Sequence, residues 1–158
     1  MKNALILLAG GKGERLGNGE PKQFLKIGNS NLIEYFLNHL NESIFDIVVI
    51  AIQNKDKKKY SNSIKKVSNY HNIKFSLAGS NRQISSKNAL KFLKKYNPTN
   101  VLIHDSARPL CSNNLSRRII ACLKIHKTCI PFIYHNDYLK SKKHIITNNK
   151  DICSIQTP

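Results

Sequence analysis

Glycine, lysine and arginine gather in one short segment near the start of the chain, Leu8-Ala9-Gly10-Gly11-Lys12-Gly13-Glu14-Arg15-Leu16-Gly17. Glycines let a backbone turn tightly and bring its amide groups close to an anion. A helix that starts after such a loop adds the positive end of its dipole. The spacing matches neither the Walker phosphate loop nor the dinucleotide fingerprint G-x-G-x-x-G. We therefore expect a phosphate cradle of another type, and a glycine turn without a ligand is the alternative.

A lysine follows this segment at a position where the backbone is restricted, in Glu20-Pro21-Lys22-Gln23-Phe24-Leu25. Because proline fixes its own backbone angle, Lys22 should be held in one direction. An ammonium group beside a phosphate cradle can stabilise the charge that develops in phosphoryl or nucleotidyl transfer. A solvated surface lysine is the alternative, and the nearby glycine segment favours the functional interpretation.

Charged residues end a third segment, Val101-Leu102-Ile103-His104-Asp105-Ser106-Ala107-Arg108-Pro109. Ligands of open α/β sheets bind at the carboxyl ends of strands. Asp105 could contact substrate hydroxyls or the water of a metal ion, and Arg108 could hold a phosphate. A surface ion pair is the alternative for these two residues. His104 fits a packed, hydrogen-bonded histidine better than a catalyst.

The segment Gly79-Ser80-Asn81-Arg82-Gln83-Ile84-Ser85 is expected to open a helix, with Ser80 or Asn81 as its N-cap. The chain has five arginines, and Arg15, Arg82 and Arg108 lie in the segments described above. In a chain so rich in lysine, an arginine indicates a geometric need such as a two-pronged contact with an oxyanion.

Short apolar runs alternate with amphipathic stretches along the chain. The runs cover residues 4–9, 46–52, 101–103, 129–134 and, more weakly, 73–77. They are continuous rather than alternating, which is typical of strands buried on both faces of a parallel sheet. Helical spacing of apolar residues covers 31–40, 60–67, 81–96 and 115–125. This order predicts a single α/β domain over residues 1–158, a three-layer α/β/α sandwich with a mostly parallel sheet.

The composition excludes several classes of protein. The apolar fraction of 41% is that of a globular protein. The chain has no uncharged apolar run that approaches the length of about 18 residues needed for a membrane span. We therefore expect a cytoplasmic protein without a membrane partner. The net charge is +17, yet the lysines are scattered and no RNA-binding aromatic motif accompanies them, so we expect phosphate-bearing small molecules rather than nucleic acid. Cys111, Cys122, Cys129 and Cys153 lack metal-site spacing and are expected to be reduced thiols.

Taken together, the loops resemble those of a known family. Leu8-Ala9-Gly10-Gly11-x-Gly13-x-Arg15-Leu16-Gly17 resembles the signature loop of nucleotidyltransferases that activate sugar and polyol phosphates. Pro21-Lys22-Gln23-Phe24, Gly79-x-x-Arg82-x-x-Ser85, the segment 104–109 and Gln156-Thr157-Pro158 narrow the resemblance. In that order they resemble the 2-C-methyl-D-erythritol 4-phosphate cytidylyltransferases of the non-mevalonate isoprenoid pathway.

The resemblance implies a Rossmann-like fold, a homodimer joined by a projecting arm at about residues 136–150, and Mg²⁺-dependent transfer of CMP from CTP to a polyol phosphate with release of pyrophosphate. It implies that Arg15 and Lys22 stabilise the transition state. It further implies binding roles for two sets of residues: for CTP, Ala9, Gly10, Gly11, Gly13, Gly79, Arg82, Ser85 and Ala107; for the polyol phosphate, Asp105, Arg108 and Asp137.

This chain departs from the family pattern in its last part. Tyr138 stands where the family usually has Thr, and Asn149 where it usually has Arg. Family members normally continue past the Gln-Thr-Pro segment to further sheet elements and a second substrate-positioning Lys. Two alternatives therefore stay open: a cytidylyltransferase for another polyol phosphate, such as ribitol 5-phosphate, and a shortened, catalytically silent protein that binds nucleotides or nucleic acid.

Overall fold

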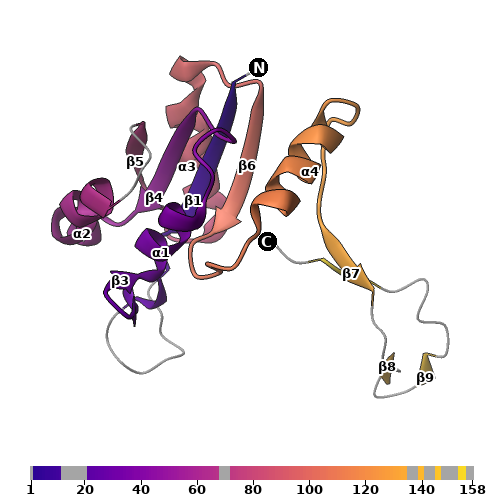
Figure 1. Ribbon diagram of the computed structural model, residues 1–158, viewed down its shortest axis with the longest axis horizontal. Helices are drawn as coiled ribbons and strands as arrows, with labels where there is room; N and C mark the ends of the chain where they lie inside the picture. Colours follow the sequence, from indigo (N-terminus) through magenta and orange to yellow (C-terminus); the bar gives the residue numbers. More distant parts are fainter. Residues whose placement is uncertain are drawn as a thin grey trace.

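A parallel sheet forms the centre of the computed structural model, which describes residues 2–11, 21–67, 72–134, 139–140, 145–146 and 153–155. Its strands lie side by side in the order β5 (Ile73–Leu77), β4 (Ile47–Ile52), β1 (Asn3–Ala9) and β6 (Asn100–Asp105). Every pairing in this sheet is parallel. Parallel neighbours need crossover connections, and helices provide them here, as Figure 1 shows.

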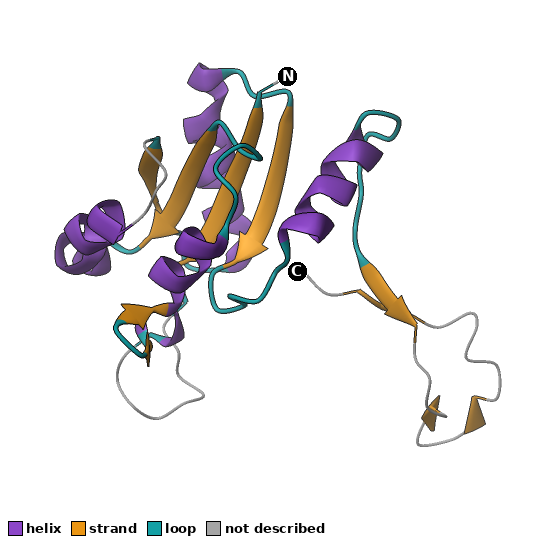
Figure 2. Ribbon diagram, in the orientation of Figure 1, coloured by secondary structure: helices purple, strands orange, loops and turns teal. Residues whose placement is uncertain are grey.

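Helices cover both faces of the sheet (Figure 2). On one face, α1 (Leu32–His39) and α2 (Asn54–Val67) share a buried cluster with Leu5 and Leu7. On the other face, α3 (Arg82–Leu93) shares a second cluster with Ala4 and Ile6. Because successive strand residues point to opposite faces, β1 is apolar from Ala4 to Ala9, where it is covered on both faces. The predicted three-layer α/β/α arrangement is confirmed.

Short elements connect β1 to α1. They are η2 (Lys22–Phe24), a turn of 3-10 helix, and the small hairpin of β2 (Lys26–Ile27) with β3 (Ser30–Asn31). Asn31 then caps α1, since its side chain accepts a hydrogen bond from the Glu34 amide at 3.0 Å. The Glu34 carboxylate accepts one from the Asn31 amide at 2.9 Å. This reciprocal cap fixes where α1 begins.

The last part of the chain leads away from the sheet. After α3 come η3 (Lys94–Tyr96), β6 and then α4 (Asn113–Leu123). Beyond them β7 (Phe132–Tyr134) pairs antiparallel with β10 (Cys153–Ile155), and β8 (Leu139–Lys140) pairs antiparallel with β9 (Ile145–Ile146). Figure 1 shows β8 and β9 projecting away from the central sheet. Within the arm expected at about 136–150, the described residues are those of β8 and β9, and its role as a dimerisation arm stays a prediction.

The structure differs from two of the predicted elements. The strand expected over 129–134 begins at Phe132, because Pro131 cannot donate to a ladder. It pairs with β10 and lies outside the central sheet. The helix expected over 60–67 begins at Asn54, six residues earlier. Its first turns are lysine-rich and carry little apolar periodicity.

Two further findings concern the described residues. Among them, no helix is long and apolar enough to cross a membrane. The cysteines whose side chains are described, Cys111, Cys122 and Cys129, are free thiols, as expected.

Candidate functional site

Loops from four neighbouring strands meet at the carboxyl edge of the sheet. The Gln53 side chain, just after β4, reaches the carbonyl oxygens of Gly10, after β1, and Gly79, after β5. After β6, Ser106 donates from its hydroxyl to the Leu8 carbonyl at 2.7 Å. The structure therefore brings together the segments that the sequence singled out around Gly10, Gly79 and Asp105.

The start of the glycine loop is held from inside the protein. Gln23 is 4% exposed, and its amide nitrogen donates to the carbonyl oxygens of Ala9 at 2.8 Å and Gly11 at 3.0 Å. The amides of Gly10 and Gly11 donate no backbone hydrogen bond to any described residue. Gly13 and Arg15, which were predicted to belong to this site, lie outside the described residues.

Two glycines of the site are required by close packing. A Cβ on Gly10 would overlap the Cβ of Ala78, and a Cβ on Gly79 would overlap the side chain of Ile84. Gly11 differs, since no described atom lies within 4 Å of the position of its Cβ. Close approach of the loops after β1 and β5 therefore explains Gly10, and close approach of the first turn of α3 explains Gly79. Packing among the described residues places no demand on Gly11.

The loop after β5 is ordered by its own side chains. The Ser85 hydroxyl accepts a hydrogen bond from the Gly79 amide at 2.9 Å and donates one to the Asn81 carbonyl at 2.8 Å. The Asn81 side chain accepts from the Ile84 amide at 2.9 Å, which makes Asn81 the N-cap of α3. Ser85 is buried and engaged with the loop, so its described contacts position Gly79.

Asp105 lies between two arginines at the end of β6. Its Oδ1 is 3.2 Å from Nε of Arg82, and its Oδ2 is 3.7 Å from Nε of Arg108. All three side chains reach solvent, so such pairs contribute about 0–1 kcal/mol each to stability. The arrangement leaves one net positive charge and several guanidinium donors at the edge, which suits an anionic ligand.

His104 supports this segment from the core, as expected for a packed histidine. It is 3% exposed, its ring stacks on Phe36 with 4.8 Å between centroids, and its Nε2 donates to the Arg108 carbonyl at 2.8 Å. The Nδ1 atom is buried and has no partner among the described residues. Burial lowers the pKa of His104, and the hydrogen bond to Arg108 opposes that shift.

The remaining predicted residues are exposed to different degrees. Ala107 is exposed between Ser106 and Arg108, and Lys22 is half-buried at the start of η2. Pro21 precedes it in an extended conformation, with φ −62° and ψ 136°. Asp137 lies outside the described residues.

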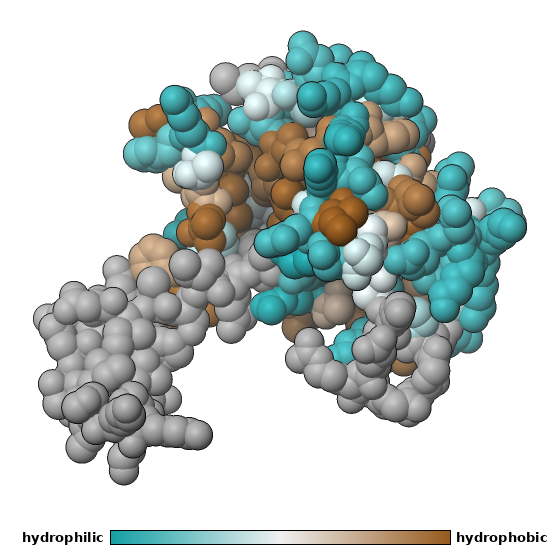
Figure 3. Space-filling view, turned by 180° about the vertical axis from the view of Figure 1, so that it is seen from behind, coloured by the Kyte–Doolittle hydropathy of each residue, from teal (hydrophilic) through white to brown (hydrophobic). Residues whose placement is uncertain are grey.

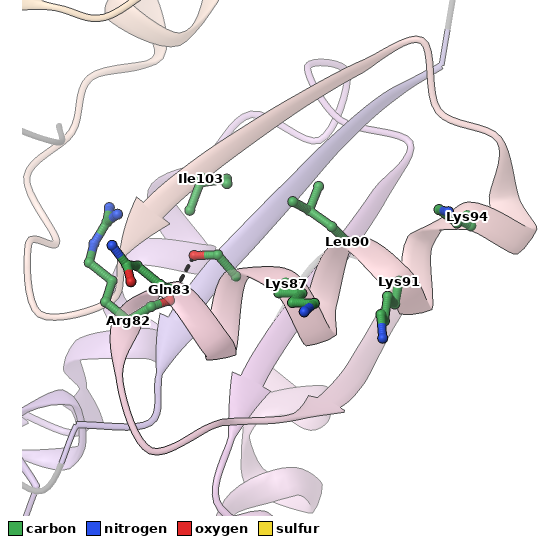
Figure 4. A pocket seen from close by; sticks show the side chains of 8 residues that line it. Arg82, Gln83, Lys87, Leu90, Lys91, Lys94 and Ile103 are labelled. Atoms are coloured by element: carbon green, nitrogen blue, oxygen red, sulfur yellow. Dashed lines mark hydrogen bonds between the residues drawn. The ribbon is translucent and has the colours of Figure 1, made fainter.

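Cavities flank β6 on both sides. One, of about 470 Å³, runs along α3, where Leu90 and Ile103 lie between the helix and the strand while Lys87 and Lys91 lie along the helix (Figure 4). The other, of about 440 Å³, lies between β6 and α4 and is lined mainly by apolar residues. Figure 3, seen from behind, shows apolar patches among polar surface on that face of the molecule. Arg82 lines both cavities.

The described residues offer Mg²⁺ little direct coordination. They contain no group of three or more His, Cys, Asp or Glu side chains that could hold a metal ion. Asp105, the carboxylate at the sheet edge, is engaged by Arg82 and Arg108. Magnesium bound to a nucleotide takes most of its ligands from phosphates and water, and that mode fits this site.

Sequence reasoning gave no role to Gln23 and Gln53, although both contact the glycine loop. A signal was present for each. Gln23 stands beside Lys22 in a segment that was already singled out, and Gln53 directly follows the apolar run 46–52 at the carboxyl end of its strand.

One known family matches this chain over nearly its whole length. The family model described as "IspD: 2-C-methyl-D-erythritol 4-phosphate cytidylyltransferase" matches residues 3–158. The 2-C-methyl-D-erythritol 4-phosphate cytidylyltransferase of Caldicellulosiruptor bescii is 35% identical over all of this chain and 71% of its own length. The bifunctional enzyme IspD/IspF of Pelagibacter ubique is 34% identical over all of this chain and 42% of its own length. The Thermotoga neapolitana cytidylyltransferase is 43% identical over 68% of this chain and 47% of its own length.

Solved structures agree on the fold. Bifunctional IspDF from Campylobacter jejuni superimposes with a TM-score of 0.75 at 29% identity, over all of this chain and 40% of that one. A 4-diphosphocytidyl-2C-methyl-D-erythritol synthase from Anaerococcus prevotii gives a TM-score of 0.77 at 22% identity, over 99% of this chain and 69% of that one. The chain thus spans about half the length of several relatives that it matches.

Proposed function

This chain belongs to the 2-C-methyl-D-erythritol 4-phosphate cytidylyltransferase family, and we propose that it transfers CMP from CTP to 2-C-methyl-D-erythritol 4-phosphate in isoprenoid precursor synthesis. A phosphate oxygen of the polyol phosphate forms a bond to the α-phosphorus of CTP. The bond from that phosphorus to the β-phosphate oxygen breaks, and pyrophosphate leaves. The observation that carries the proposal is the convergence of the loops after β1, β5 and β6, each bearing one of the family's segments, at one edge of the sheet.

In this proposal each loop binds a different part of the two substrates. Ala9, Gly10, Gly11 and Gly13 surround the triphosphate, and Arg15 and Lys22 stabilise the charge that develops on the reacting phosphate. Gly79 and Ser85 form the cytosine side, supported by Arg82, and Ala107 approaches the ribose. Asp105, Arg108 and Asp137 hold the polyol phosphate. Backbone amides turned outward and guanidinium groups are the donors that phosphates need.

Magnesium enters the proposal as an ion carried by CTP. Bound to the triphosphate, it neutralises phosphate charge and favours departure of pyrophosphate. The contribution of this chain is to hold the nucleotide so that the α-phosphorus faces the polyol phosphate. The described residues contain no set of ligands for the ion, so the phosphates of CTP and water would hold it.

Assembly and location remain predictions. We propose a homodimer in which the segment at about 136–150 contacts the partner, a single domain over residues 1–158, and a cytoplasmic location. Antiparallel pairing of β8 with β9 is compatible with an arm of this kind. A measured molecular mass in solution, with and without residues 136–150, tests the dimer.

The proposed reaction is tested by pyrophosphate release. The chain is incubated with Mg²⁺ and CTP, and with either 2-C-methyl-D-erythritol 4-phosphate or ribitol 5-phosphate. We expect release with the first substrate and little with the second. Preference for ribitol 5-phosphate would move the assignment to another polyol phosphate, and release with neither would favour the silent nucleotide-binding alternative.

A further inference from the structure

We propose that Gln23 and Gln53 are positioning residues for CTP: their side-chain amides hold the carbonyls of the glycine loop inward and thereby aim the loop's own amides at the triphosphate. The inference rests on the proposed function, since it concerns how the same site receives CTP. Neither residue is expected to touch the reacting atoms.

The contacts cover consecutive peptide units. Gln23 donates to the carbonyl oxygens of Ala9 and Gly11 at 2.8 and 3.0 Å. The side-chain amide nitrogen of Gln53 lies 3.4 Å from the carbonyl oxygen of Gly10, which stands between Ala9 and Gly11 in the chain. Every carbonyl from Ala9 to Gly11 therefore faces a glutamine amide, at a place where two successive glycines would otherwise leave the backbone with many accessible conformations.

Peptide planarity turns these contacts into a direction for the amides. In a trans peptide the C=O of one residue and the N–H of the next point to opposite sides. A carbonyl of Ala9 held by Gln23 turns the Gly10 amide away from Gln23, and a carbonyl of Gly10 held by Gln53 turns the Gly11 amide away from Gln53. Amides turned outward in succession form the concave donor surface that binds phosphates.

Gln23 is itself firmly anchored. It occupies the middle of η2, where the Phe24 amide donates to the Pro21 carbonyl at 2.9 Å. Phe24 is 2% exposed and stacks on Tyr60 with 3.9 Å between ring centroids. The same turn carries Lys22, so a single turn of 3-10 helix sets both the lysine and the glutamine against the loop. Groups fixed before the ligand arrives need no reorganisation during the reaction.

Gln53 adds a link between two loops. Its amide nitrogen is also 3.4 Å from the Gly79 carbonyl, in the loop proposed for cytosine. Bonds of this length are weaker than those of Gln23, so we expect a smaller effect from Gln53 at each carbonyl. Because it contacts both loops, its loss should loosen the spacing between the triphosphate side and the cytosine side.

The test compares near-isosteric variants by calorimetry with the full chain. Q23E and Q53E replace a donor with a carboxylate that repels the carbonyls, and Q23L removes the donor without adding charge. Q83E, on the exposed surface of α3, is the matched control. Affinities for Mg²⁺–CTP and for CMP are measured between about pH 8 and about pH 5.5, across the range in which a buried glutamate can bind a proton.

We expect Q23E to weaken CTP binding about tenfold or more at the upper pH, and CMP binding much less, because CMP lacks the outer phosphates. The loss should shrink as pH falls, since a protonated carboxyl donates to a carbonyl again. Q53E should show a smaller loss, and Q83E none. Q23L should weaken CTP without the recovery at low pH.

The outcomes separate the inference from the function on which it rests. If the unaltered chain binds CTP and both Q23E and Q53E bind it equally well, the positioning role alone is overturned. Equal losses for CTP and CMP overturn it as well, because they indicate general damage to the loops. Absence of CTP binding by the unaltered chain overturns the proposed function and the positioning role together. If Q23E does not fold, Q53E decides, since Gln53 is half-buried and outside the core.

Discussion

At the scale of single residues, Asp105 joins two arginines that are distant in the sequence into one charged surface. Arg82 begins α3 and Arg108 follows β6, yet both guanidinium groups face the same carboxylate. The sequence indicated that these arginines matter, because most cations in this chain are lysines. It could not indicate that they share Asp105, since the pairing depends on where α3 begins relative to the end of β6.

Lys22 provides the first prediction at this scale. Lys22→Ala should lower the rate of pyrophosphate release about a hundredfold or more, with little change in the affinity for CTP, because the ammonium group is proposed to act on charge that develops in the transition state. Lys26→Ala is the matched control, an exposed lysine two residues beyond η2. Single-turnover pyrophosphate assays measure the rate, and an unchanged rate for Lys22→Ala would remove Lys22 from the catalytic role.

His104 predicts how stability depends on pH. Its pKa is lowered by burial in the folded protein, so between that pKa and the ordinary value near 6.5 the unfolded chain binds more protons. The free energy of unfolding should therefore fall as pH drops below about 6.5, by at most about 1.4 kcal/mol per pH unit from this group. The contribution is fully present above about pH 6.5.

The variant His104→Phe isolates this effect, because it keeps a ring against Phe36 and cannot titrate. Denaturant unfolding at several pH values should give a shallower loss for the variant than for the native chain below about pH 6.5. Identical pH profiles would show that His104 is protonated equally in both states. A raised KM for the polyol phosphate would further show that His104 holds Arg108 in place.

At the scale of elements, the order of strands and helices follows from pattern alone. The continuous apolar runs 4–9, 46–52 and 101–103 each became a strand of the central sheet. The first two are largely buried, whereas 101–103 lie half-buried in the edge strand β6. The start of α2 was missed because the first turns of that helix carry lysines and no apolar stripe. The fate of 129–134 was missed because an apolar run does not reveal which sheet it joins.

The prediction at the scale of elements concerns the close packing of the loops after β1 and β5. Gly10→Ala should destabilise the fold by about 1–3 kcal/mol, because the new methyl group meets the Cβ of Ala78. The double variant Gly10→Ala with Ala78→Gly should recover most of that loss, since it vacates the contested space. Thermal unfolding measures both.

Gly11→Ala is the matched control, and its unfolding should match that of the native chain, because no described atom opposes the added Cβ. Sequence alone could not distinguish these neighbouring glycines, because only the fold shows how close the loop after β5 comes to Gly10. A double variant as unstable as Gly10→Ala would show that backbone freedom, rather than contact with Ala78, explains Gly10.

At the scale of the whole molecule, charge is the property that fits the proposed function least directly. The net charge of +17 exceeds what a phosphate-binding site needs. Many of the lysines lie on α2 and along the cavity beside α3. Scattered surface cations attract any polyanion weakly. The charge therefore bears on association in general, while the arginines and amides at the sheet edge bear on selectivity.

This view predicts that RNA binding is weak and collapses with salt. Fluorescence anisotropy with an unstructured RNA should show affinity falling steeply between about 50 mM and about 200 mM salt, with no preference for sequence. Binding of Mg²⁺–CTP should change far less over the same range. Tight RNA binding that survives the higher salt would support the nucleic-acid-binding alternative.

The most direct test of the account is a calorimetric titration of the 158-residue chain with Mg²⁺–CTP, beside UTP and ATP. The account predicts saturable binding of CTP, one per chain, and much weaker binding of the other two nucleotides, because the loops after β1 and β5 together form a triphosphate and cytosine site. A folded chain that binds none of the three, or all of them equally, would contradict it.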